Sequence, residues 1–67
     1  MCLLRVYLET GSSGKKLIAQ DVSFILHEKG RVTVKDIEFK EIFLENVEIS
    51  VVDALNSVLI LKRKGED

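Results

Sequence analysis

Hydrophobic and polar residues alternate along most of this chain with a period of two, a pattern typical of half-buried β-strands. The alternation starts at Leu4, so Leu4, Val6 and Leu8 share one face of an expected strand, and more polar neighbours share the other. The same period returns at residues 31–35 and 47–51, and no stretch sustains the period of a helix. We therefore expect strands along the whole chain.

Glycine and polar residues interrupt the alternation at intervals of about ten residues, as turns between short strands do. Residues 15–19 and 21–26 are expected to form two short strands with a kink near Gln20. The hydrophobic parity changes within residues 37–44, which indicates either a tight turn near Glu38 and Phe39 or a β-bulge near Ile42. We expect turns at residues 10–14, 27–30, 36, 45–46 and 53–57, the last with room for one helical turn.

Six or seven short antiparallel strands predict an all-β fold, a partly closed barrel of SH3-like or OB-like size. Closure would remove the exposed strand edges that otherwise invite aggregation. Residues 58–61 are almost continuously apolar, which favours a strand covered on both sides, either by the barrel and a neighbouring element or by a second subunit. The high proportion of Val, Ile and Leu in so short a chain also favours an outer apolar face that pairs with a second copy. We predict one domain over residues 1–64, followed by a charged tail at 65–67. The residues expected to face the core are Leu4, Val6, Leu8, Val32, Val34, Val47, Ile49 and Val51, together with the three phenylalanines.

A chain of 67 residues buries so little surface that its stability is expected to be marginal without further support. Its single cysteine, Cys2, excludes an internal disulfide, which leaves a metal ion or oligomerisation as the supplement.

The charge balance of ten Lys and Arg against eleven Asp and Glu gives no concentrated basic face, so we expect no nucleic-acid partner. No apolar run reaches the roughly 18 residues of a membrane span, and the first residues lack the pattern of a signal peptide. We expect a cytoplasmic protein without membrane contact.

Catalytic patterns in the sequence are weak, and we predict that the protein is not an enzyme. A nucleophile pair would need Cys2 and His27, and nothing in their spacing indicates that they meet. His27 is typical of a surface turn. The carboxylate pairs, Glu38 with Glu41 and Glu45 with Glu48, are typical of solvated positions. The loop at residues 10–14 is rich in glycine and serine, but it lacks the Gly-Lys-Ser/Thr ending of a phosphate-binding loop, and no helix signal follows it.

Cys2 opens the first expected strand, two residues before the alternation begins at Leu4, and it supports two interpretations. A lone cysteine is commonly a small buried hydrophobic residue. Alternatively, the Met1 amine, the Cys2 amide and the Cys2 thiolate can chelate one ion, a donor set that suits square-planar Ni(II) or Cu(II) better than tetrahedral Zn(II). A two-fold homodimer with Cys2 near its axis would double the thiolate ligands.

Several segments, in this order and spacing, resemble the CooT-type nickel-binding proteins. They are Met1-Cys2-Leu3, the stretch from Lys16-Leu17 to Asp21-Val22, residues 30–37, residues 49–53 and residues 59–61. The resemblance implies a small β-barrel homodimer that binds Ni(II) through Cys2 and assists nickel delivery to carbon monoxide dehydrogenase.

The chain departs from the CooT pattern at three places: the longer loop at residues 10–14, residues 38–40 where a Phe-Gly turn is common, and the turn at residues 54–57. None of these includes Cys2. The HypC-type hydrogenase-maturation chaperones share the opening Met-Cys-Leu, but they continue with an Ile-Pro-Gly segment where this chain has Arg5-Val6-Tyr7 and contains no proline. A HypC-type chaperone and a small nucleic-acid-binding barrel are the alternative interpretations.

Overall fold

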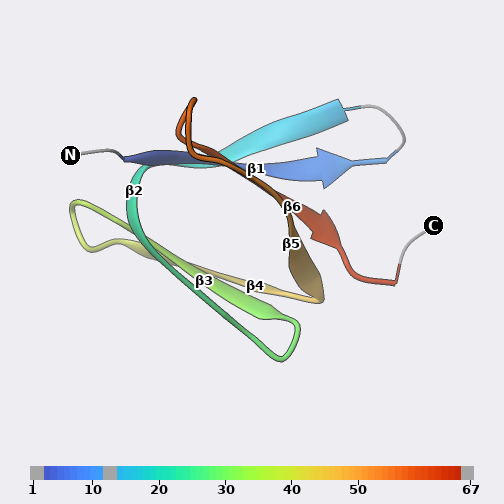
Figure 1. The fold of residues 1–67 in the computed structure, drawn as a ribbon. Coiled ribbons are helices and arrows are strands. Elements are labelled where there is room, and N and C mark those ends of the chain that lie inside the picture. The colour runs from blue at the N-terminus through green and yellow to red at the C-terminus, as the bar shows by residue number, and fades with distance from the viewer. Residues whose placement is uncertain (1–2, 12–13, 66–67) are drawn as a thin grey trace.

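The computed structural model describes residues 3–11 and 14–65, and these residues form six strands joined by turns (Figure 1). The predicted all-β class is confirmed. The strands are β1 (Leu4–Thr10), β2 (Gly14–Glu28), β3 (Arg31–Asp36), β4 (Glu41–Glu45), β5 (Val47–Asp53) and β6 (Val58–Arg63).

The six strands form one sheet in the order β4-β3-β2-β1-β6-β5, and this sheet does not close on itself. Neighbouring strands are antiparallel except β1 and β6, which are parallel. The prediction of antiparallel strands throughout was therefore wrong for one pair. The physical reason is that β5 and β6 form a hairpin of their own, and the pairing of that hairpin with β1 is a long-range contact that local alternation does not encode.

The long strand β2 serves both halves of the sheet. Its first half pairs with β1 and its second half with β3, with Val22 at the changeover. Asp21 has a φ of 56°, and its carbonyl oxygen accepts a hydrogen bond from the Ile37 N–H at 3.0 Å. Aspartate tolerates this left-handed conformation better than most residues. The expected kink near Gln20 is thus a bend within one strand of 15 residues, and it turns the two halves of the sheet toward each other.

The core lies between these two halves and is built almost entirely from valine and leucine. The predicted inward faces of β1 and β3 are confirmed, and so are Val47 and Ile49, the latter packing at the edge of the core. The buried residues are Val6, Leu8, Val22, Val32, Val34, Val47, Leu59 and Leu61.

The phenylalanines do not belong to the core, and their prediction as core residues was wrong. Phe24, Phe39 and Phe43 are 47%, 80% and 63% exposed. Phe24 and Phe43 lie opposite Lys35 and Thr33 of β3, on the outer face of the sheet. Phe39 lies in the turn after β3 with a φ of 66°.

Val51 was also predicted to face the core, but it is 42% exposed. The pairing of β5 with β6 shifts register between Ile49 and Val51, which leaves Ser50 as an extra residue. Such a bulge exchanges the faces of all later residues in the strand, so Val51 faces outward.

The change of hydrophobic parity within residues 37–44 is due to a tight turn between β3 and β4. The Asp36 Oδ1 atom accepts hydrogen bonds from the N–H groups of Glu38 and Lys40 at 2.8 and 3.1 Å. The register between β3 and β4 is unbroken, so no bulge lies at Ile42.

Candidate functional site

The predicted metal ligand, Cys2, lies outside the described residues, and the structure does not test it. The strand that follows it is held firmly at its start. Leu4 pairs with Val22, and the Arg5 N–H donates to the Ser57 carbonyl oxygen at 3.0 Å. The chain therefore enters the sheet at a fixed point between β2 and the turn that precedes β6.

Asp53 organises that turn. Its Oδ1 atom accepts the Asn56 N–H at 3.1 Å, and its Oδ2 atom accepts the Asn56 side-chain amide at 2.9 Å. The side-chain hydrogen bond from Asn56 is the main reason that the pKa of Asp53 is lowered, with backbone N–H groups contributing and desolvation opposing. Both carboxylate oxygens are thus engaged in a structural turn, and the residues after Asp53 form turns and no helix.

His27 is exposed near the far end of β2, where it pairs with Val32. It is five residues beyond Val22, the partner of Leu4, which corresponds to roughly 15 Å along a strand. The structure therefore does not bring His27 to the beginning of β1.

Of the four carboxylates that were considered as pairs, Glu38, Glu41 and Glu45 are exposed and Glu48 is half-buried, and three of the four have a basic partner. Glu38 lies 3.3 Å from Lys40, Glu41 lies 3.8 Å from Lys35, and Glu48 lies 3.8 Å from Lys62. Within residues 3–11 and 14–65, no three His, Cys, Asp or Glu side chains gather in a way that would hold a metal ion.

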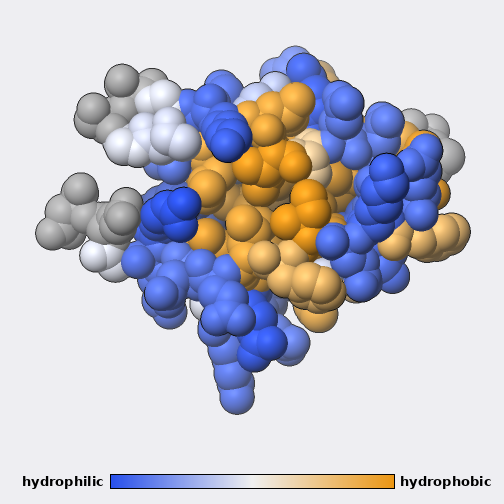
Figure 2. Space-filling view, turned by 180° about the vertical axis from the view of Figure 1, so that it is seen from behind, coloured by the Kyte–Doolittle hydropathy of each residue, from blue (hydrophilic) through white to orange (hydrophobic). Residues whose placement is uncertain are grey.

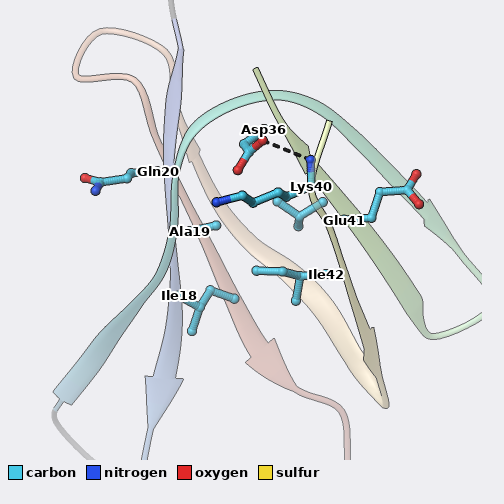
Figure 3. A pocket seen from close by; sticks show the side chains of 8 residues that line it. Ile18, Ala19, Gln20, Asp36, Lys40, Glu41 and Ile42 are labelled. Atoms are coloured by element: carbon cyan, nitrogen blue, oxygen red, sulfur yellow. Dashed lines mark hydrogen bonds between the residues drawn. The ribbon is translucent and has the colours of Figure 1, made fainter. Parts of the chain in front are cut away.

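A cavity of about 340 Å³, which the sequence did not reveal, opens between β2 and the β3–β4 hairpin. Ile18 and Ile42 point into it from opposite sides, and Asp36, Lys40 and Glu41 lie at its rim (Figure 3). Ala19, Gln20 and Val34 complete its lining. The cavity depends on where the first half of β2 separates from β3, and no local pattern in the sequence encodes that separation.

Ten large hydrophobic side chains of the described residues are exposed, and Figure 2 shows a continuous hydrophobic area ringed by hydrophilic residues on one face of the molecule. Exposed apolar patches of this kind often mark interaction surfaces. The ten residues are Leu17, Phe24, Leu26, Ile37, Phe39, Ile42, Phe43, Val51, Val52 and Leu55.

The strand registers place four apolar residues in one row across the outer face of β2, β1, β6 and β5. Tyr7 pairs with Leu17 on one side and with Ile60 on the other, and Ile60 pairs with Val51. Tyr7 and Ile60 lie between buried neighbours in their strands, so their side chains face outward. We call Leu17, Tyr7, Ile60 and Val51 the outer apolar row.

Charged and polar groups of both signs border the outer apolar row. The Lys15 ammonium lies 5.2 Å from the centroid of the Tyr7 ring, and Glu48 pairs with Lys62 beyond Val51. Glu9 accepts a hydrogen bond from the Ser50 hydroxyl at 3.2 Å. A surface with an apolar centre and a rim of mixed sign is able to pack against a copy of itself.

Comparison with protein-family models finds no match for this chain, and comparison with curated proteins finds no match either. Among the described residues there is no helix with the length and hydrophobicity needed to cross a bilayer.

Proposed function

We propose that this protein is a cytoplasmic nickel-binding accessory protein that binds Ni(II) through Cys2 and assists nickel delivery to carbon monoxide dehydrogenase or another nickel enzyme. The observation that carries the proposal is the order and spacing of the segments that resemble the CooT-type proteins, beginning with Met1-Cys2-Leu3. A small, partly closed SH3-like or OB-like barrel that acts as a homodimer is part of the same proposal.

The beginning of β1 supports a metal-binding role for Cys2, which lies two residues before it in the sequence. Arg5 is fixed to Ser57 by a backbone hydrogen bond, and Leu4 is paired with Val22. A ligand that precedes a fixed strand loses less conformational freedom on binding a metal than one in a free terminus. A thiolate with backbone nitrogen donors then suits Ni(II).

The outer apolar row supports the homodimer. A second copy would cover Tyr7 and Ile60, and it would supply apolar burial to a chain with only a small core. An isologous dimer also doubles every ligand near its axis, which is how a chain with one cysteine obtains a two-thiolate site.

The test is a Ni(II) titration of the wild-type chain and the Cys2→Ser variant, monitored by calorimetry and by thiolate-to-nickel absorption. We expect one nickel ion per two chains for the wild type and loss of both signals for Cys2→Ser, while light scattering still reports a dimer. His27→Asn is the matched control, and it should bind nickel as the wild type does. Unchanged nickel binding by Cys2→Ser would overturn the proposal.

A further inference from the structure

Strand β4 forms one end of the sheet, and among the described residues it pairs with β3 alone. Across the cavity, the first half of β2 pairs with β1, and within the part of the chain that the structure describes it has no strand partner on its other side. Alternate residues of an edge strand direct backbone N–H and C=O groups away from the sheet. Two free strand edges therefore border one apolar cavity (Figure 3).

The edge at β4 contains no proline, lysine or bulge, three of the features that protect natural edges from pairing. β4 reads Glu41-Ile42-Phe43-Leu44-Glu45, so its protection is the negative charge at its two ends, which opposes acidic strands but not basic ones. Phe43 is 63% exposed on its outer face, and Ile42 is 37% exposed on the side of the cavity. An edge of this composition favours the addition of another strand.

The charges on the outer face show which strand would fit. β3 places Arg31 and Lys35 opposite Glu45 and Glu41, with Thr33 opposite Phe43 between them. Lys35 lies 3.8 Å from Glu41 and 5.2 Å from the centroid of the Phe24 ring. Strand β4 is therefore already paired on one side with a strand that carries cations four residues apart. A strand that pairs with the free side of β4 would likewise be stabilised by cations opposite Glu41 and Glu45.

We propose that the free edge of β4 binds an extended segment of a partner protein that carries Lys or Arg at two positions four residues apart, with apolar or β-branched residues between them. The two cations would lie beside Glu41 and Glu45, and the central residue would cover Phe43. The residues between, pointing to the other face, would enter the cavity beside Ile18 and Ile42. Backbone hydrogen bonds supply affinity in this mode, and alternate side chains supply specificity.

The β4 strand of a second copy fits this edge poorly. Antiparallel pairing of two β4 strands centred on Phe43 would place each Glu41 opposite Glu45 of the partner subunit, and parallel pairing in register would place like residues together. Both arrangements oppose carboxylates directly, which destabilises a strand pair. This inference does not depend on nickel binding, because it uses none of the residues of the proposed metal site.

The test uses the full chain labelled with ¹⁵N and two blocked peptides with the cores Lys-Val-Thr-Val-Lys and Glu-Val-Thr-Val-Glu. We expect the basic peptide to shift the amide signals of residues 41–45 and 17–20, and the acidic peptide to bind about tenfold more weakly, because two opposite-charge pairs become like-charge pairs. Equal affinity for both peptides, or shifts confined to other strands, would overturn the proposal.

Two variants assign the preference to β4. The Glu41→Gln/Glu45→Gln double variant removes both carboxylates of β4 and adds no charge that would repel Lys35 or Arg31. It should therefore bind both peptides equally. The matched control, Glu9→Gln/Glu48→Gln, changes the net charge by the same amount on other strands and should keep the preference for the basic peptide. Loss of preference in the control would overturn the assignment to β4.

If the signals of residues 41–45 depend on protein concentration in the absence of peptide, the occupant is a second copy and the proposal fails.

Discussion

Single residues fix the turns of this protein through side-chain oxygens that accept backbone N–H groups. Asp36 holds the turn after β3, and Asp53 holds the turn before β6. Aspartate is favoured at such positions because its short carboxylate reaches the N–H groups of residues just ahead of it. Asp53 has the additional effect of linking the stability of the fold to pH.

The pKa of Asp53 is lowered from its ordinary value of 3.8, chiefly by the hydrogen bond from the Asn56 side chain. A group with a lowered pKa in the folded state stabilises the fold above its unfolded pKa, and that contribution disappears as the pH falls through the folded value. We therefore expect Asp53→Asn to lower the free energy of unfolding at pH 7, and the difference from wild type to shrink below pH 3.8.

Urea unfolding of both proteins across this pH range measures the difference. A difference that stays constant from neutral to acid pH would contradict the role of the ionised carboxylate.

At the scale of elements, the hairpin between β2 and β3 depends on two residues with positive φ. Glu28 pairs with Arg31, and the connecting residues Lys29 and Gly30 have φ values of 51° and 76°. A two-residue turn with both φ values positive matches the right-handed twist of its flanking strands. The Gly30 carbonyl oxygen also accepts the Val47 N–H at 3.1 Å, so this turn connects β2 and β3 to the start of β5.

We expect Gly30→Ala to lower the free energy of unfolding by about 1 kcal/mol, because alanine is strained at positive φ. A Cβ atom at this position would lie 3.8 Å from the Lys64 side chain, an ordinary contact, so backbone strain is the cause rather than collision. Lys29→Gly in the same turn should instead relieve strain and leave stability equal or higher. Chemical denaturation measures both variants, and a stable Gly30→Ala protein would contradict this account of the turn.

At the scale of the whole molecule, the outer apolar row makes the proposed dimer a source of stability. The core contains only eight buried hydrophobic residues among those described, so covering Tyr7 and Ile60 would add substantially to the buried apolar surface. The melting temperature is then expected to rise with protein concentration.

We expect Ile60→Lys to convert the dimer to a monomer, because it places a charge in the centre of the outer apolar row. Analytical ultracentrifugation measures the change. The control Phe43→Lys introduces the same charge on β4, at the other end of the sheet, and should leave the dimer intact. If Phe43→Lys rather than Ile60→Lys gives monomers, the dimer surface lies on the opposite half of the sheet.

The sequence by itself determined the all-β class, the inward faces of β1 and β3, and most turn positions, because alternation and turn chemistry are local properties. It pointed to Cys2, and that residue stays a prediction. Only the tertiary structure decided the parallel pairing of β1 with β6, the outward faces of Phe24 and Phe43, and the open edge at β4. These features depend on which distant strands become neighbours and on where a bulge shifts their register. Both are determined by contacts between residues that are far apart in the chain, which local patterns do not encode.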